Sequence, residues 1–355
     1  MSKFFSKKYS ALKAYVPGEQ PKDMKYIKLN TNESPFPPPP SVAAAVKAET
    51  GRLQLYSDPE CTSLTNASAE LFGVKNDEII MTNGSDEILN FAFMAFCDSE
   101  HSIVFPDITY GFYSVFAQLN GIPYEEIPLC DDFTVSVDDY CGINKNIVIA
   151  NPNAPTGILL SLDDIERIVS SNPDNVVIID EAYVDFGGES AIPLIHKYSN
   201  LMVTGTFSKS RSMAGARLGF GIADATLIAD IKTIKYSTNP YNINRMTMVA
   251  GYQAILANDY FMDNCHLIIK NREWTSQRLA ELGFSITDSK ANFIFAKHGK
   301  ISGETLYKSL KARGVLVRHF AKPRISDYVR ITVGTSDQMQ VLVNEIKNIL
   351  EEIDS

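Results

Sequence analysis

A lysine, an aspartate and an arginine stand in sequence contexts that suit one kind of chemistry. Lys209 closes the polar turn 206–209, Asp180 ends the apolar run 176–179, and Arg217 lies shortly after the lysine. A lysine amine reacts with an aldehyde, a buried carboxylate holds a proton on a heterocyclic nitrogen, and an arginine fork binds a phosphate. A pyridoxal 5'-phosphate (PLP) enzyme needs these three groups, so the sequence predicts a PLP site.

Polar residues also follow five predicted strands, each at the carboxyl end of its strand. These strands are expected at 78–82, 101–105, 146–150, 175–179 and 201–204. Open parallel sheets bind ligands at the carboxyl ends of their strands, so the polar residues should meet at one edge. The candidate cofactor-binding residues in these segments are Gly84, Ser85, Asp86, Tyr110, Asn153, Asp180, Tyr183, Thr206, Ser208 and Lys209.

Each of these residues allows two interpretations, one as part of a cofactor site and one as an ordinary structural residue. The segment 84–86 opens a predicted helix, where free N–H groups attract an anion, but it is also a plain helix start. The ring of Tyr110 could lie against a flat cofactor, or simply fill the core. Asn153 and Tyr183 could bond the cofactor's phenolic oxygen, although Asn153 also suits a turn. The set as a whole, rather than any single member, favours the cofactor site.

The elements that must position these residues alternate between short apolar strands and helices. This rhythm predicts an α/β fold with a mostly parallel central sheet and helices on both faces. After about residue 245 the pattern changes to long helices, strands at 291–296, 315–318 and 328–333, and a last helix, which indicates a smaller α+β domain. The expected division is an N-terminal arm that joins the small domain (1–39), a large PLP-binding domain (40–245) and a small C-terminal domain (246–355).

Composition excludes several other classes of protein. The chain has 355 residues, of which 45% are hydrophobic and 21% charged, as in soluble globular proteins. A net charge of −9 argues against a nucleic-acid partner. No apolar run has the length of a membrane span or follows the basic start as a signal peptide would, so we expect a cytoplasmic protein. Five scattered cysteines and five histidines without ligand spacing predict reduced thiols and no metal site.

Several longer strings carry a resemblance to a known family. They lie at 29–33, 83–87, 109–114, 152–157, 180–183, 208–209, 214–219 and 329–334. In this order they resemble the fold-type-I PLP aminotransferases and, among these, the histidinol-phosphate aminotransferases, from about Tyr15 to the C-terminus. The resemblance implies a homodimer with shared active sites. It also implies transamination between glutamate and imidazole-acetol phosphate, which gives 2-oxoglutarate and histidinol phosphate in histidine biosynthesis.

The resemblance also implies a role for each matching residue. Lys209 matches the lysine that binds the cofactor aldehyde, Asp180 the partner of the pyridine nitrogen, and Tyr183 the partner of the phenolic oxygen. Tyr110 matches the stacking aromatic residue. The matching phosphate-binding residues are Ser85 and Asp86, through backbone N–H groups, with Ser208, Arg217 and, from the neighbouring subunit, Tyr56. The matching substrate-side residues are Tyr15, Asn32, Arg318 and Arg330.

Two positions depart from the family's pattern. Ala154 stands directly before a proline, where the family has the asparagine that bonds the phenolic oxygen. Either Asn153 substitutes for this asparagine, or Tyr183 alone forms the hydrogen bond with the phenolic oxygen. Ser57 follows Tyr56, where the family often has proline. Near the expected substrate arginines, Lys322 and Arg324 are predicted to be solvated loop residues.

Alternative functions remain open from the sequence. An aromatic or other amino-acid aminotransferase and a threonine-phosphate decarboxylase share much of this pattern. A nucleotide-binding Rossmann protein would need Gly-x-Gly-x-x-Gly after an early strand, and only a weak Gly-Phe-Gly at 219–221 is present. A non-catalytic regulator would carry a basic DNA-binding extension, for which the chain has no segment.

Overall fold

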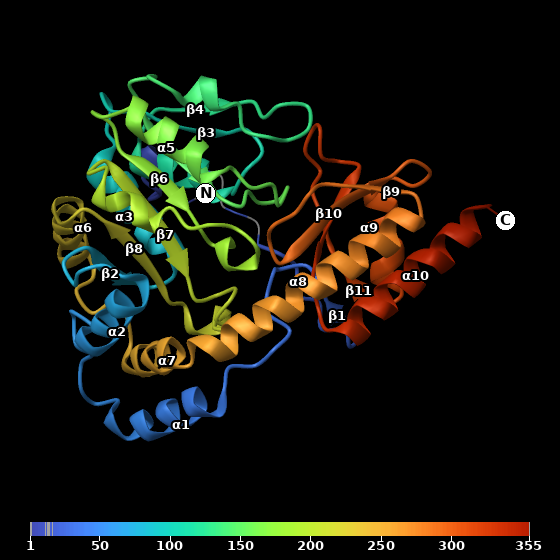
Figure 1. Ribbon diagram of the computed structural model, residues 1–355, viewed down its shortest axis with the longest axis horizontal. Helices are drawn as coiled ribbons and strands as arrows, with labels where there is room; N and C mark the ends of the chain where they lie inside the picture. The colour runs from blue at the N-terminus through green and yellow to red at the C-terminus, as the bar shows by residue number, and fades with distance from the viewer. Residues whose placement is uncertain (1, 11, 13–14, 16, 355) are drawn as a thin grey trace.

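A seven-stranded sheet forms the centre of the larger part of the molecule (Figure 1). The computed structural model describes residues 2–10, 12, 15 and 17–354, so parts of the predicted arm lie outside the described residues. Within these residues the strand order of the sheet is β2-β8-β7-β6-β5-β3-β4. Its strands are β2 (Ile79–Thr82), β3 (Ile103–Pro106), β4 (Tyr124–Ile127), β5 (Asn146–Ala150), β6 (Val177–Asp180), β7 (Leu201–Thr206) and β8 (Gly219–Ala223).

One strand of this sheet runs against all the others. β3, β4, β5, β6 and β7 are parallel, whereas β8 is antiparallel to both of its neighbours, β7 and β2. The prediction of a mostly parallel sheet is therefore confirmed. The carboxyl ends of β2, β3, β5, β6 and β7 all lie on one edge, and the start of β8 lies on that same edge.

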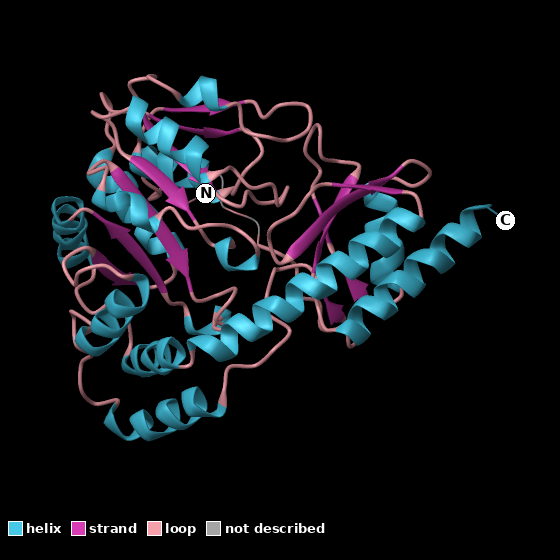
Figure 2. Ribbon diagram, viewed as in Figure 1, coloured by secondary structure: helices cyan, strands magenta, loops and turns pink. Residues whose placement is uncertain are grey.

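Helices cover both faces of the sheet (Figures 1 and 2). Strand β6 shows why: Val177 and Ile179 pack into the core on one face and Ile178 into the core on the other. A strand with both faces buried has apolar residues in succession rather than in alternation. The helices of this part are α1 (Pro40–Glu49), α2 (Thr62–Phe72), α3 (Ser85–Phe96), α4 (Phe112–Asn120), α5 (Leu162–Ser171), α6 (Ala225–Thr238) and α7 (Arg245–Leu256).

The remaining elements build a second core around a smaller, antiparallel sheet. Its strand order is β12-β13-β10-β9, and the long helix α8 runs from the larger part onto it (Figure 1). The elements of this smaller part of the molecule are α8 (Asn258–Glu281), β9 (Phe284–Ile286), β10 (Phe293–His298), α9 (Gly303–Ala312), β11 (Val315–Leu316), β12 (Arg318–His319), β13 (Tyr328–Thr332) and α10 (Ser336–Asp354).

The N-terminal segment returns to this smaller core. Strand β1 (Ile27–Lys28) pairs with β11 in parallel, and Leu29 is buried among the side chains of the second core. These contacts support the expected return of the arm (1–39) to the small domain. The division into a large domain at 40–245 and a small domain at 246–355 stays a proposal, and α7 packs in the core of the larger part. The prediction of one strand at 315–318 is wrong, because β11 pairs with β1 whereas β12 pairs with β13 in another sheet.

Strand β4 has no counterpart in the sequence prediction. It lies at the sheet edge with mostly exposed side chains, two of them glutamates, and is held by backbone pairing with β3. Such a strand carries no apolar pattern. In the part of the chain that the structure describes, no helix has the length and apolar character to cross a membrane.

Candidate active site

A cavity of about 570 Å³ opens at the carboxyl edge of the central sheet, between the two cores. It collects predicted residues from strand ends, the N-terminal segment and the small sheet. Those that line it are Tyr15, Asn32, Ser85, Asp86, Tyr110, Asp180, Tyr183, Thr206, Ser208, Lys209, Arg217, Arg318 and Arg330. Another hollow, of about 630 Å³ around 131–134 and 285–290, is lined by none of the predicted residues. The first cavity is therefore the candidate active site.

Asp180 ends β6 as a buried carboxylate without a cationic partner among the described residues. Burial raises the pKa of Asp180 to about 6, against the opposing effect of a hydrogen bond from Tyr113 Oη to Oδ2 at 2.8 Å. Thr204 Oγ1 adds a longer bond to Oδ1 at 3.4 Å. A buried carboxylate needs compensation, and a protonated ring nitrogen would supply it.

Lys209 lies just beyond the end of β7, with its amine inside the cavity. Its Nζ donates to the backbone oxygen of Thr31 at 3.3 Å and lies 5.7 Å from the ring centre of Tyr183. The hydroxyl oxygen of Tyr183 accepts a 2.9 Å bond from Asn32 Nδ2. The phenolic proton of Tyr183 is then available for another acceptor, such as a cofactor oxygen.

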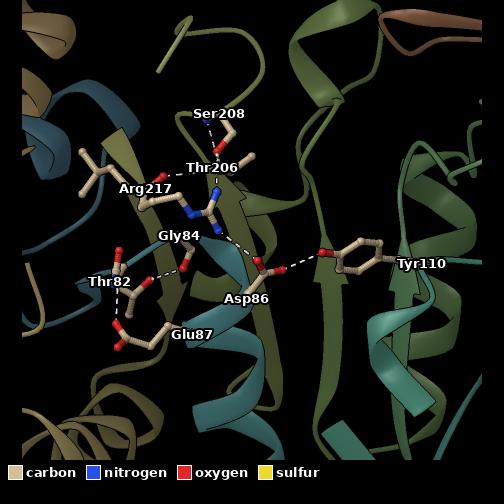
Figure 3. Close-up of polar contacts among 10 residues, drawn as sticks. Thr82, Gly84, Asp86, Glu87, Tyr110, Thr206, Ser208 and Arg217 are labelled. Carbon is tan, nitrogen blue, oxygen red and sulfur yellow. Dashed lines mark hydrogen bonds and ion pairs between the residues drawn. The ribbon is translucent and has the colours of Figure 1, made fainter. Parts of the chain in front are cut away.

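The amino end of helix α3 and Arg217 form the polar end of the cavity (Figure 3). The Asp86 carboxylate accepts from Arg217 Nη2 at 2.9 Å and from Tyr110 Oη at 2.6 Å. Gly84 precedes the helix, and a Cβ there would lie 2.6 Å from Arg217 Nη2. Arg217 Nη1 also reaches Ser208 Oγ at 3.5 Å. Free helix N–H groups beside a guanidinium suit a phosphate.

The backbone at Arg217 explains how the arginine reaches this place. Arg217 adopts a left-handed conformation with φ of 55°, uncommon for a residue with a side chain. The antiparallel strand β8 starts two residues later, at the edge where the other strands end. Thr206, at the end of β7, donates to Ser208 Oγ at 3.0 Å and completes the polar surface.

Two arginines of the small domain close the opposite side of the cavity. Arg330 donates to the backbone oxygen of Asn30 at 3.0 Å, while its enclosed Nε has no hydrogen-bond partner among the described residues. The guanidinium of Arg318 lies 5.4 Å from the ring centre of Phe320. Tyr15 packs against the ring of Phe112, tilted by 31°, and remains partly exposed. An enclosed guanidinium N–H without a partner is suited to an anionic ligand.

Three predicted cofactor residues do not line the cavity. Gly84 lies directly behind it, against Arg217. The amide of Asn153 is used internally: Nδ2 donates to Ile108 O and Thr156 Oγ1, and Oδ1 accepts from Thr109 Oγ1. Of the two ways in which the phenolic oxygen could be bonded, this geometry favours Tyr183. The ring of Tyr56 is 80% exposed and stacks on Tyr241, outside the cavity of its own chain.

Three further residues lie at or near the site, although they are not among the predicted site residues. Lys322, expected in solvent, lines the cavity and donates to the backbone oxygen of Asp107. Arg324 forms an ion pair with the Asp107 carboxylate at 3.2 Å, so the loop of the small domain contacts the large domain. Tyr113 contacts Asp180 from inside the core. Its place three residues after Tyr110, in the first turn of α4, is the sequence signal that points to it, and the two ring centres lie 5.6 Å apart.

Comparison with known proteins identifies the family of this chain. The family described as aminotransferase class I and II matches residues 24–346. The chain belongs to this family. It is 50% identical to a histidinol-phosphate aminotransferase of Brachyspira hyodysenteriae, over 99% of this chain and 100% of that one. It is 46% identical to the protein of the same name from Clostridium acetobutylicum, with the same coverage.

A solved structure extends the similarity to the fold of the enzyme. The crystal structure of histidinol-phosphate aminotransferase from Sinorhizobium meliloti, in complex with pyridoxal-5'-phosphate, matches with a TM-score of 0.89. Its sequence is 21% identical, and the match covers 99% of each chain. The α/β fold predicted from the sequence is thus the fold of known aminotransferases.

The residues present in the cavity fit PLP. The buried Asp180 pairs with no cation in the described part of the chain, and a protonated pyridine would provide one. Tyr183 keeps a phenolic proton to donate, and Lys209 places an amine beside it. Arg217 and the start of α3 offer donors to a phosphate. Each part of the cofactor therefore has a complementary group among the residues that line the cavity.

Proposed function

We propose that the enzyme is a PLP-dependent histidinol-phosphate aminotransferase. It transfers the amino group of glutamate to imidazole-acetol phosphate and forms histidinol phosphate and 2-oxoglutarate. The observation that carries this proposal is one cavity that holds Lys209, Asp180 and Tyr183 on one side and two arginines, Arg318 and Arg330, on the other. The names of its relatives support the same substrate.

Bound PLP supplies an aldehyde that takes up the amino group and a ring that accepts electrons. Asp180, as an anion, holds the proton on the ring nitrogen and so keeps that ring electron-poor. Tyr183 donates its phenolic proton to the cofactor's oxygen, because its own oxygen already accepts from Asn32. Thr206, Ser208, Arg217 and the N–H groups that open α3 bind the phosphate.

Lys209 is the residue that moves a proton. Its amine lies beside Tyr183 and the carbonyl oxygen of Thr31, and from this place it would act as the general base that removes the proton from the substrate carbon that bears the amino group and returns it to the cofactor carbon. Replacing Lys209 by alanine removes both the attachment point and the base. Borohydride treatment should therefore fix the cofactor to the native chain and not to Lys209→Ala.

Arg318 and Arg330 bind the anionic end of the substrate. Histidinol phosphate has no carboxylate, so these two guanidiniums bind its phosphate. In the other half of the cycle they bind the side-chain carboxylate of glutamate. Tyr15 at the cavity edge offers a further hydrogen bond.

The substrate proposal is tested by comparing three amines. Purified enzyme should show a much higher kcat/KM for histidinol phosphate than for phenylalanine, with 2-oxoglutarate as acceptor, and should not release CO₂ from threonine phosphate. Turnover of phenylalanine alone would assign the enzyme to the aromatic aminotransferases. Release of CO₂ from threonine phosphate would assign it to the decarboxylases.

The proposal includes a homodimer in which Tyr56 completes the neighbouring site. Its ring is exposed, away from its own cavity, next to the exposed leucines Leu53 and Leu55. Mixing Lys209→Ala with Tyr56→Ala tests this arrangement. If the sites are shared, hybrid dimers contain one intact site and activity rises to about a quarter of native, because half of the dimers are hybrids. If Tyr56 serves its own chain, the mixture has only the mean activity of its components.

The same proposal places the enzyme in the cytoplasm. The five cysteines are all free thiols, as expected for a reducing compartment. Substrates are small molecules, and the net charge of −9 argues against a nucleic-acid partner. Fractionation of cells that express the tagged protein would test the location.

A further inference from the structure

A tyrosine outside the cavity contacts its most buried carboxylate. Tyr113 has no exposed surface, and its Oη donates a 2.8 Å hydrogen bond to Oδ2 of Asp180. It is absent from the residues that line the cavity, so it reaches a ligand only through Asp180. Two other groups donate to the carboxylate: Thr204 Oγ1 at 3.4 Å, and the backbone N–H of Ala182.

The ring of Tyr113 is held on several sides. It begins helix α4 with Phe112 and packs 5.7 Å from the ring of Phe105. It also meets the edge of Tyr110 at 5.6 Å and 83°. A tyrosine ring enclosed in this way has few alternative rotamers, so its hydroxyl stays directed at Asp180. The same ring thus supports Asp180 and Tyr110, the proposed stacking residue.

Two features of the surroundings of Asp180 disfavour its charge. Burial raises its pKa, and the negative charge of Asp86 from helix α3 adds to the rise. Tyr110 and Tyr183 also face this group of residues, and Lys209 lines the same cavity. Among the groups that lower the pKa of Asp180, the hydroxyl of Tyr113 has the largest effect.

We propose that Tyr113 is a positioning residue: it holds Oδ2 of Asp180 and stabilises the carboxylate as an anion that pairs with a protonated ring nitrogen. The inference rests on the proposed function, because the ring nitrogen belongs to PLP. Asp180 and that nitrogen share one proton. A hydrogen bond to Oδ2 stabilises the charged carboxylate and therefore keeps the proton on the nitrogen.

The variant Tyr113→Phe removes this bond and leaves the ring in place. Tyr140→Phe is the matched control, since Tyr140 is equally buried but its hydroxyl has no hydrogen-bond partner among the described residues. Each protein is loaded with PLP that carries ¹⁵N in its ring, and the ring-nitrogen resonance is recorded. Native protein and control should show a protonated nitrogen. In Tyr113→Phe the resonance should move toward that of neutral pyridine.

Activity gives a second readout of the same bond. In Tyr113→Phe, kcat should fall about tenfold or more, the factor that one pKa unit represents, whereas KM should match the control. An unchanged resonance in Tyr113→Phe overturns the inference, whatever its activity. A neutral ring nitrogen in the native protein would instead contradict the proposed role of Asp180, and the inference would fail with it.

A double variant covers the case in which an unpaired buried carboxylate prevents folding. Asp180→Asn carries no charge, so Tyr113→Phe added to it creates no buried anion. If Tyr113 acts through Asp180, the second substitution changes neither the resonance nor kcat beyond Asp180→Asn alone. A further loss in kcat of the same size as in the native background would show that Tyr113 acts independently, and the inference would be wrong.

Discussion

Asp86 and Arg217 form an ion pair at the polar end of the cavity, with Oδ2 and Nη2 2.9 Å apart (Figure 3). The same carboxylate accepts from Tyr110, so one side chain connects the proposed phosphate and stacking residues. An ion pair this exposed contributes little stability, about 0–1 kcal/mol. Arg217 can therefore exchange its ion pair with Asp86 for one with a bound phosphate at a small cost in free energy. Asp86 would still accept the hydrogen bond from Tyr110.

Replacing Arg217 by alanine should weaken PLP binding. Loss of charge-assisted hydrogen bonds to a phosphate should raise the dissociation constant about tenfold to a hundredfold. Titration of cofactor-free protein with PLP, followed by absorbance, measures this change. Arg313→Ala is the control, because Arg313 pairs with Glu345 and Glu352 away from the cavity. Equal affinities in the two variants would show that the phosphate lies elsewhere.

Replacing Arg330 by lysine keeps the positive charge and removes the planar guanidinium, so it tests which of the two binds the substrate. The guanidinium lies 5.3 Å from the ring centre of Phe293 and 5.5 Å from that of Phe320, and an ammonium does not replace a planar, forked group beside aromatic rings. We expect the KM for histidinol phosphate to rise about tenfold, with a smaller change in kcat. Arg278→Lys, also an arginine beside an aromatic ring but on the surface, should leave both constants unchanged. A native KM in Arg330→Lys contradicts the assignment.

Glu181 predicts a pH dependence of folding stability. Burial raises its pKa from 4.5 to about 8, against hydrogen bonds from Ser190 and Ala191. Between these two pH values the folded state keeps a proton that the unfolded chain has released, so this residue's contribution to stability falls as pH rises. Glu181→Gln removes the effect. Relative to the native chain, its free energy of unfolding should rise by up to about 1.4 kcal/mol per pH unit in this window.

Urea unfolding of cofactor-free protein from about pH 5 to about pH 8 measures that difference. Glu304→Gln is the control, because Glu304 is an exposed carboxylate paired with Lys308, and its pKa is lowered rather than raised. Its difference from the native chain should stay constant over the same range. A constant difference for Glu181→Gln as well would mean that Glu181 titrates normally.

Gly219 should tolerate no side chain. A Cβ there would lie 2.5 Å from Ser85 N and from Gly84 C, where β8 meets the start of α3. Gly219→Ala should therefore lower stability by about 1–3 kcal/mol and also weaken PLP binding, since the helix start must shift. Gly215→Ala is matched to it, because a Cβ at Gly215 meets nothing within 4 Å. Thermal unfolding and PLP titration should distinguish the two, and indistinguishable behaviour would contradict the close approach.

Local sequence patterns were sufficient for much of the sheet. Strand β5 has the predicted bounds of 146–150, because a polar Asn146 followed by the apolar run 147–150, buried on both faces, marks a short strand. The edge strand β4 was missed, since its exposed side chains carry no such signal. The run 315–318 predicts one strand, yet its two ends pair with different partners, and pairing is a long-range property.

The sequence by itself determined that Asp180 and Lys209 lie on one edge, because both follow strands of a parallel sheet and strand direction sets where their ends meet. Only the tertiary structure decided which other groups reach them. Arg330 bonds the backbone of Asn30, 300 positions away, and Tyr113 approaches Asp180 from a separate helix. The Asn153 amide donates to the backbone oxygen of Ile108 instead of facing the cavity, and the sequence around Asn153 does not predict this bond. These contacts depend on packing between segments that are distant in the sequence, so no local sequence pattern predicts them.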